Sequence, residues 1–415
     1  MRAARLRFAA RMAERARIAV TAMGSEGDVR PFVALAVGLR RGGHEAWLVA
    51  AERFRARSEG ASVPFRPTGQ DWDEAAYRAT MSAVFAEKNP LKQIKAFVEV
   101  GVSELAAAAQ GVVEGTRDAD LIVHHAGDVN AFAASIVHGT PRITGTLAPG
   151  LLPGGLAAWM ARLMTPRMTD TSFNRVLAAA GVGPRRRIVL ETAESPLLNL
   201  VAISPHVVPP KSAWRGRYEA TGYWFLDEPS FAPDPALRAF VEGGEPPVVI
   251  TFGSMTELDA RVVGLGAAIV EGVRRSGRRA VVQAKDGLGE GVAIPDCVHV
   301  TGYAPHDWLF PRSAGVVHHG GAGTSAAALR AGAPQSMVWI FGDQPAWGKL
   351  LFKRGVAAAP MPLAQLTPDK LAERLRAMDP GMKARASELG ARIAAEDGVG
   401  RACARVSETV LAAVT

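Results

Sequence analysis

Short apolar runs alternate with amphipathic stretches along the chain from residue 17 onward. In the first half the β-rich runs fall at 18–22, 46–50, 121–124, 142–146 and 198–203. Apolar runs separated by helical segments are typical of parallel strands covered by helices on both faces. The pattern therefore predicts an α/β fold built from doubly wound, Rossmann-like sheets.

A stretch rich in proline and acidic residues interrupts the alternation at 226–247, and predicted strands resume at 248–252, 280–283, 298–301, 315–318 and 337–340. With 415 residues, 48% of them hydrophobic, the chain is too long for one ordinary core. We therefore expect five segments. These are a basic extension (1–16), a first Rossmann-like domain (17–226), a linker (227–247), a second Rossmann-like domain (248–385) and C-terminal helices (386–415). Whether the last segment crosses back to the first domain is left open.

Composition narrows the classes of partner. No window approaches 18 uninterrupted apolar residues, which argues against a membrane-spanning helix. The net charge of +8 comes without any nucleic-acid module, so nucleic acid is not an expected partner. Cys297 and Cys403 have neither disulfide nor zinc spacing, and a cytoplasmic location fits best. The basic extension lacks the apolar stretch of a secretory signal and permits at most peripheral membrane contact. We expect a monomer or homodimer.

The loop after the first predicted strand carries a carboxylate at a helix entrance. It reads GSEGDVRP over residues 24–31, and Gly42 and Gly43 follow the last turn of the predicted helix as a stop signal. Asp28 at the mouth of the sheet could accept a proton from a substrate hydroxyl. It could equally be the N-cap of a helix that begins near Pro31, with the proline in the first turn. The two roles are compatible.

A second loop, VVHHGGAGTSA at 316–326, is rich in glycine and leads from a buried strand into a helix predicted at 326–331. Backbone N–H groups and the positive helix end would face a ligand there, so an anion is expected. His318, Thr324 and Ser325 add donors, and no acidic cluster stands nearby to hold a metal. A turn needed only for close packing is the alternative.

The same stretch fits a second class of protein. Gly321, Gly323 and Ala326 satisfy GxGxxA, and Asp343 follows about twenty residues later, as in dinucleotide-binding sites. A nicotinamide-dependent oxidoreductase is therefore a competing hypothesis. Against it, the motif opens the fourth strand of its domain and follows two histidines.

Two further loops follow predicted strands of the second domain. Asp343 and Gln344 pair a carboxylate with a carboxamide, which together can bind vicinal hydroxyls such as those of a sugar; a helix cap is the alternative for Asp343. Ser254, after the strand at 248–252, would add a hydroxyl to the same edge of the sheet.

The longest motif, at 303–348, resembles the nucleotide-sugar signature of family 1 GT-B glycosyltransferases. Within them it is similar to the branch of sterol 3-beta-glucosyltransferases and antibiotic (vancomycin-type) glycosyltransferases. The PHDWLFP run at 305–311 and the segment from Ser204 to Asp227 resemble the sterol enzymes, and GSEGDVRP resembles an acceptor-side loop found in both groups. The resemblance covers nearly everything after Arg17. It implies two Rossmann-like domains facing across a cleft, the first binding the acceptor and the second the nucleotide sugar.

The resemblance also implies roles for individual residues. Asp28 matches the general base, and Asp343 and Gln344 match the pair that holds the donor sugar. Tyr303 stands where plant members have a base-stacking tryptophan, and Trp308 could serve instead. The residues expected at the donor diphosphate are His318, Gly320, Gly321, Gly323, Thr324 and Ser254.

Some positions depart from the family pattern, and the acceptor region is the least defined. Ala326 replaces the glutamate that binds ribose in plant members, and Glu26 adds negative charge beside the predicted base. We expect Ser25, His124 and Trp159 on the acceptor side, among apolar walls suited to a lipophilic alcohol or phenol. For most apolar residues of that region, ordinary helix packing is the alternative.

Together these features predict an inverting, metal-independent O-glycosyltransferase without a cofactor. It would move a hexose, preferably glucose, from a UDP- or dTDP-sugar to a natural product, macrolide, phenol or sterol. The alternatives are an NAD(P)-dependent oxidoreductase, a nucleotide-sugar epimerase of the same architecture and a non-catalytic nucleotide-sugar binder.

Overall fold

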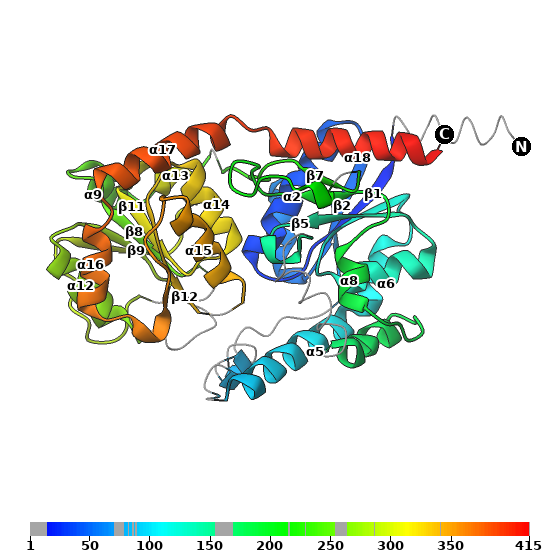
Figure 1. Cartoon of the computed structure of the whole chain (residues 1–415), viewed down its shortest axis with the longest axis horizontal. Helices are drawn as coiled ribbons and strands as arrows, with labels where there is room; N and C mark the ends of the chain where they lie inside the picture. The colour runs from blue at the N-terminus through cyan, green and yellow to red at the C-terminus, as the bar shows by residue number, and fades with distance from the viewer. Residues whose placement is uncertain are drawn as a thin grey trace, which may run out of the picture. The chain divides into compact units, whose positions relative to one another are not determined.

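The computed structural model divides the chain into two compact units, each described below by itself (Figure 1). One unit contains residues 1–226 together with 397–415, and the other contains 227–396. The structure describes residues 15–69, 79–81, 83–84, 87, 89–153, 169–214, 216–228, 230–253, 264–285, 287–340 and 342–414.

The first unit is built on seven parallel strands in the order β3-β2-β1-β4-β5-β6-β7. Their bounds are β1 Arg17–Thr21, β2 Glu45–Ala50, β3 Phe65–Pro67, β4 Leu121–His125, β5 Arg142–Thr146, β6 Asn199–Val201 and β7 Tyr218–Ala220. The order reverses direction between β1 and β4. Ligands of such sheets bind at that point, beyond the carboxyl ends of the strands.

Helices cover both faces of this sheet. Ile18 and Val20 of β1 belong to one buried cluster with residues of α2 (Glu26–Arg41) and α18 (Gly398–Val414). Ala19, on the opposite face, belongs to a cluster with residues of α5 (Pro90–Thr116) and α6 (Val129–His138). Two further helices among the described residues of this unit are short: α3 (Arg55–Gly60) and α8 (Ile188–Ala193). This alternation of strand residues between the two faces decides below which side chains reach the site.

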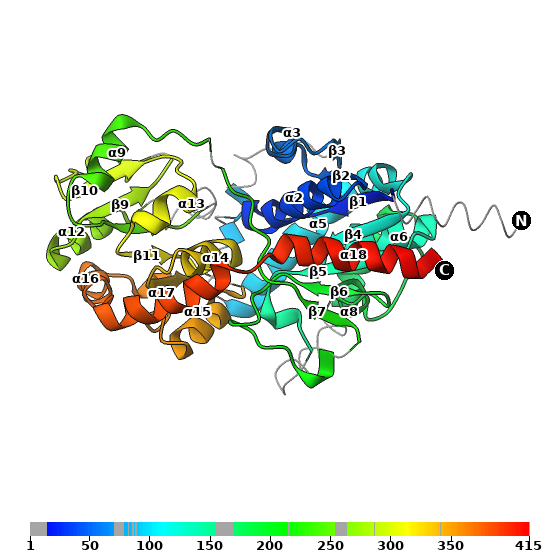
Figure 2. The same ribbon diagram turned by 90° about the horizontal axis from the view of Figure 1, so that it is seen from above.

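The C-terminal helix α18 packs directly on α2, and both views show it beside that part of the sheet (Figures 1 and 2). The two helices approach closely at Gly38, where a Cβ atom would lie 2.5 Å from Val399 Cγ1 and 2.7 Å from Cys403 Sγ. His44 Nε2 lies 2.8 Å from Ser407 Oγ. The last segment of the chain is therefore part of the core of the first unit.

The second unit is built on six parallel strands in the order β10-β9-β8-β11-β12-β13. Their bounds are β8 Val248–Thr251, β9 Ala280–Gln283, β10 Val298–Thr301, β11 Gly315–His318, β12 Gln335–Trp339 and β13 Met361–Pro362. The α-helices that the structure describes in this unit are α9 Pro235–Glu242, α12 Gly266–Ser276, α13 His306–Leu309, α14 Ala322–Arg330, α15 Gln344–Lys353, α16 Pro368–Arg376 and α17 Pro380–Ala394. The order reverses between β8 and β11, which defines a second ligand-binding edge.

The prediction of two parallel Rossmann-like sheets is confirmed, and the predicted strands are all present with shifts at their ends. The sequence pattern missed β3, β7 and β13, which have two or three residues each and lie at sheet edges. The stretch 227–247, expected to be a linker, instead contains α9, whose Leu237 and Val241 are buried in the core of the second unit.

Over the residues that the structure describes, no helix is long and apolar enough to cross a membrane.

The close approach of α2 and α18 gives a stability test. We expect Gly38→Ala to lower the free energy of unfolding by about 1–3 kcal/mol, because the added methyl group overpacks against branched and sulfur-containing side chains. Gly60→Ala is the matched control, since a Cβ there has nothing within 4 Å. Denaturant unfolding of both variants measures the difference; equal stabilities would contradict the packing described.

Candidate active site

The carboxylate of Asp28 is fixed at the entrance to α2. Its Oδ2 accepts hydrogen bonds from the Ser25 backbone N–H at 2.8 Å and from Ser25 Oγ at 2.9 Å. The helix begins at Glu26, with Ser25 as N-cap, so Asp28 lies in the first turn and Pro31 in the helix interior. The alternative that Asp28 is the N-cap of a helix beginning near Pro31 was therefore wrong. No other described residue donates to its Oδ1.

Gly24 makes room for this carboxylate. Its φ is +107°, in the left-handed region, and a Cβ there would lie 2.5 Å from Asp28 Oδ2. Only glycine combines that backbone conformation with that contact. The neighbouring Glu26 forms an ion pair with Arg57 at 2.9 Å, so the negative charge predicted beside the base is compensated by a partner on α3.

The two histidines that end β4 point to opposite faces of the sheet. His124 is fully buried on the α5/α6 side, where Nδ1 donates to the His125 carbonyl at 2.9 Å and Arg142 lies 3.3 Å from Nε2. Burial, with a smaller effect of Arg142, lowers the pKa of His124 to about 3. His124 is therefore a buried structural residue and does not reach an acceptor, contrary to the prediction. His125 is half-buried on the opposite face, edge-on to Phe32 of α2.

In the second unit, the glycine-rich loop is shorter than predicted. Gly320, with φ +94°, and Gly321 follow β11, and α14 already begins at Ala322. Gly323 and Thr324 therefore lie in the first turn of the helix, whose N–H groups have no partner within the helix. Ser325 Oγ donates to the Gly321 carbonyl at 2.8 Å and closes the turn. The Thr324 hydroxyl has no partner among the described residues, which leaves it available to a ligand.

His318 orients this loop from inside the sheet. The ring is fully buried; Nδ1 accepts from Gly320 N–H at 3.1 Å, and Nε2 donates to Gln335 Oε1 at 2.9 Å. Burial lowers the pKa of His318 to about 4, so the ring is neutral near pH 7. Both nitrogens are used within the protein, so the structure does not show the predicted direct donation to a diphosphate. Instead, His318 fixes the Gly320 amide by accepting its hydrogen bond.

His319, which the sequence prediction missed, is the more accessible of the two rings. It is half-buried between Gly253 and Gly321, and a Cβ on either glycine would contact it. Its Nδ1 has no hydrogen-bond partner among the described residues. Burial, with smaller effects of His318 and His306, lowers the pKa of His319 to about 3. The HHGG motif placed two histidines before the glycine-rich loop. The sequence alone did not show which of the two rings points into the core, because that depends on which face of the sheet each strand residue occupies.

Asp343 and Gln344 begin α15 after β12. Asp343 is exposed and its Oδ2 accepts from Trp347 Nε1 at 3.1 Å, whereas the Gln344 side chain is buried and its Oε1 accepts from Ile340 N–H at 2.7 Å. The Gln344 backbone and Cβ lie against Gly320. The structure thus brings this pair beside the glycine-rich loop.

Of the two aromatic residues expected at a nucleobase, Tyr303 is exposed and Trp308 is covered. The Tyr303 side chain is 56% exposed, and its hydroxyl donates to Glu228 Oε1 at 2.7 Å. Trp308 has the Arg312 guanidinium over its ring at 4.9 Å and the edge of Phe231 at 5.7 Å. Tyr303 is therefore the better surface for stacking.

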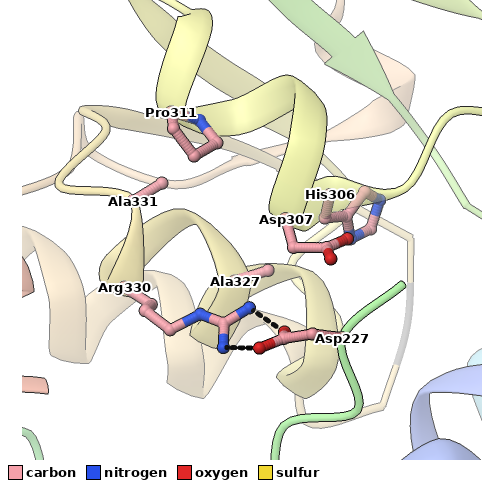
Figure 3. A pocket seen from close by; sticks show the side chains of 7 residues that line it. All are labelled: Asp227, His306, Asp307, Pro311, Ala327, Arg330 and Ala331. Carbon is pink, nitrogen blue, oxygen red and sulfur yellow. Dashed lines mark hydrogen bonds and ion pairs between the residues drawn. The ribbon is translucent and has the colours of Figure 1, made fainter. Parts of the chain in front are cut away.

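A pocket of about 360 Å³, lined by both polar and apolar residues, lies in the same unit next to α13 and α14 (Figure 3). Asp227 and Arg330 form an ion pair of 2.6 Å at its rim. None of the lining residues belongs to the glycine-rich loop. The lining residues are Asp227, His306, Asp307, Pro311, Ala327, Arg330 and Ala331.

Two predicted site residues, Ser254 and Trp159, lie outside the described residues. Within the described ranges, no group of three or more histidine, cysteine or acidic side chains could hold a metal ion. In the first unit, a fixed carboxylate can accept a proton. In the second unit, open N–H groups of a helix start can stabilise a negative charge.

Comparisons with known proteins define the class of this protein. Residues 18–118 match the glycosyltransferase family 28 N-terminal domain, and residues 251–403 match the C-terminal domain of erythromycin biosynthesis protein CIII-like proteins. The chain is 34% identical to O-mycaminosyltylonolide 6-deoxyallosyltransferase of Streptomyces fradiae, over 94% of this chain and 97% of that enzyme. It is 31% identical to a sterol 3-beta-glucosyltransferase of Arabidopsis thaliana, over 94% of this chain and 67% of that enzyme.

Solved structures show the same fold at low identity. The glycotransferase of kitacinnamycin superposes with a TM-score of 0.72 at 17% identity, covering 95% of this chain and 99% of that one. Glycosyltransferase VinC in complex with DTDP gives 0.69 at 21% identity, covering 94% and 99%. The chain therefore belongs to the GT-B glycosyltransferases, and is related to macrolide glycosyltransferases and sterol 3-beta-glucosyltransferases. It is an enzyme that uses a nucleotide-sugar donor; the oxidoreductase alternative finds no support among these relatives.

Three histidines with lowered pKa values predict how stability depends on pH. His124, His318 and His319 have folded pKa values of about 3, 4 and 3, below the ordinary value of 6.5. Between pH 6.5 and 4 the unfolded chain therefore binds more protons, and stability falls as the pH falls. We expect each such histidine to contribute about 1.4 kcal/mol per pH unit to that fall.

The variant His318→Asn tests this slope, because the asparagine carbonyl can still accept from the Gly320 amide. We expect its free energy of unfolding, measured in denaturant at pH 7, 6 and 5, to decrease less steeply than that of the wild type. Parallel curves would show that His318 is not held neutral in the folded protein.

Proposed function

We propose that this protein is an inverting, metal-independent glycosyltransferase. It transfers a hexose from a nucleoside-diphosphate sugar to a hydroxyl group of a lipophilic natural product or sterol. The observation that carries the proposal is the arrangement of Asp28: Ser25 fixes one carboxylate oxygen, and no other described residue donates to the second oxygen at the carboxyl end of β1. A carboxylate held in this way can take a proton from an acceptor hydroxyl.

The reaction is a single displacement. As the acceptor oxygen attacks the anomeric carbon of the sugar, its proton passes to Asp28 and a carbon–oxygen bond forms. The bond from that carbon to the diphosphate oxygen breaks, and the nucleoside diphosphate leaves with the bonding electrons. Attack opposite the leaving group inverts the configuration of the anomeric carbon.

The leaving diphosphate is stabilised by uncharged donors. The donors in this proposal are the first-turn N–H groups of α14, the Thr324 hydroxyl in that turn, and the His319 ring, which lies against Gly321. Fixed dipoles aimed at a developing charge usually make the largest single contribution to catalysis. This arrangement supports diphosphate binding without a metal ion.

For the sugar, the relatives point in two directions. The Streptomyces fradiae relative is named as a 6-deoxyallosyltransferase and the Arabidopsis thaliana relative as a glucosyltransferase. We favour glucose, because the exposed carboxylate of Asp343 beside Gln344 can bind hydroxyls that a deoxysugar lacks. Of the solved neighbours, VinC is in complex with DTDP, so both UDP- and dTDP-sugars belong in a donor screen.

The role of Asp28 is tested by Asp28→Asn. The asparagine carbonyl can still accept from Ser25, so the loop keeps its fold, while the base is lost. We expect kcat to fall by about 10²- to 10⁴-fold. Glu26→Gln is the matched control in the same loop, because Glu26 pairs with Arg57, and it should keep kcat within about threefold. Transfer from UDP-glucose to a panel of phenols and sterols gives the readout; full activity of Asp28→Asn would end the assignment.

Donor binding separates this function from its rivals. We expect UDP and dTDP to raise the melting temperature, with the same shift in EDTA as in Mg²⁺, because amides and hydroxyls hold the diphosphate. NADH should give no shift. Donor turnover only in the presence of acceptor distinguishes a transferase from an epimerase or a binding protein. A shift that requires Mg²⁺ would contradict metal independence, and a shift with NADH alone would favour the oxidoreductase.

A further inference from the structure

Two residues at the start of the second unit, Glu228 and Phe231, contact the exposed aromatic residue Tyr303. We call Asp227, Glu228 and Phe231 the boundary residues. The Glu228 carboxylate accepts from the Tyr303 hydroxyl at 2.7 Å, and Phe231 meets the Tyr303 ring edge-on, with centroids 6.5 Å apart and planes at 90°. Glu228, at the start of the second unit, thus holds the hydroxyl end of the Tyr303 ring, and Tyr303 lies in the loop after β10.

The backbone around Glu228 is anchored independently of this carboxylate. Asp227 pairs with Arg330 of α14, as Figure 3 shows, and the Glu228 N–H donates to Asp307 Oδ2 at 2.8 Å. Phe231 also contacts Trp308, a partly buried residue that packs against the core cluster of the unit. Removal of the Glu228 carboxylate therefore leaves three attachments of the boundary residues in place.

Tyr303 needs such a restraint to act as a stacking surface. At 56% exposure its ring has few packing contacts, and an unrestrained ring would lose rotational freedom on binding a base. A hydrogen bond from a phenol to a carboxylate is stronger than a hydrogen bond between two neutral groups. The carboxylate and the Phe231 edge together fix the plane of the ring before the nucleotide arrives.

We propose that Glu228 is a positioning residue for nucleotide binding: it acts through Tyr303, whose ring stacks on the pyrimidine base of the donor. The proposal rests on the proposed function, which places a nucleoside diphosphate at the glycine-rich loop of the same unit. It predicts an effect on donor affinity and none on the chemical step, since Glu228 touches neither the sugar nor the diphosphate.

The test compares four variants of the full chain with the wild type: Glu228→Ala, Glu228→Gln, Tyr303→Phe and the double variant Glu228→Ala/Tyr303→Phe. Calorimetry with UDP and dTDP gives the Kd, and transfer assays give the donor KM and kcat. We expect Glu228→Ala and Tyr303→Phe each to weaken binding about three- to tenfold, and we expect Glu228→Ala to raise the donor KM while changing kcat by less than about twofold. The double variant should bind no more weakly than either single one, since both remove the same bond.

Glu228→Gln keeps an acceptor oxygen for the tyrosine and should restore most of the affinity, which a merely structural role would not require. Glu290→Ala, an exposed acid in the same unit, is the matched control and should leave the Kd unchanged. Wild-type affinity of Glu228→Ala, multiplicative losses in the double variant, or failure of Glu228→Gln to recover binding would each overturn the proposal. A wild type that binds neither nucleotide would instead overturn the proposed function, and this inference with it.

Discussion

The site depends on one constraint of parallel sheets: where strand order reverses, a loop must turn from the carboxyl end of a central strand into the first turn of a helix. The N–H groups of that turn have no partner within the helix. Both units use this feature, at the start of α2 and at the start of α14. In the first, the turn carries a carboxylate held by Ser25. In the second, the open N–H groups themselves form the site.

Each turn is tight enough to require glycine at one position. Gly24 and Gly320 both have φ in the left-handed region, and a side chain on either would strike the residue that the loop presents. For Gly24 that residue is Asp28, and for Gly320 it is Gln344 of the next loop. The glycines therefore allow neighbouring groups to lie close together. Because no other residue fits these positions, glycine stands out in both sequence motifs.

Sequence patterns predicted the central strands because those strands are apolar on both faces, and the motif loops because glycine and polar residues follow them directly. They missed the edge strands β3, β7 and β13, which are too short to show a pattern. They also placed the starts of α2 and α14 four or five residues too late, since Ser25 and Gly321 were not recognised as caps. The predictions for the two histidine pairs failed for another reason. Adjacent residues of a strand point to opposite faces, so only the register shows that His124 and His318 turn inward while His125 and His319 remain accessible.

The donor site is notable for the absence of charge in its loop: residues 316–326 contain no lysine or arginine, and burial keeps both histidines neutral. In the proposed function a diphosphate would be held by amide, hydroxyl and imidazole dipoles, and the hydrogen bonds of His318 with Gly320 and Gln335 set the orientation of this loop in advance. Such dipoles stabilise negative charge where it develops and need no counter-ion to reorganise. Because the two histidines of this loop are neutral near pH 7, the proposed reaction confines the change of charge to the substrates and Asp28.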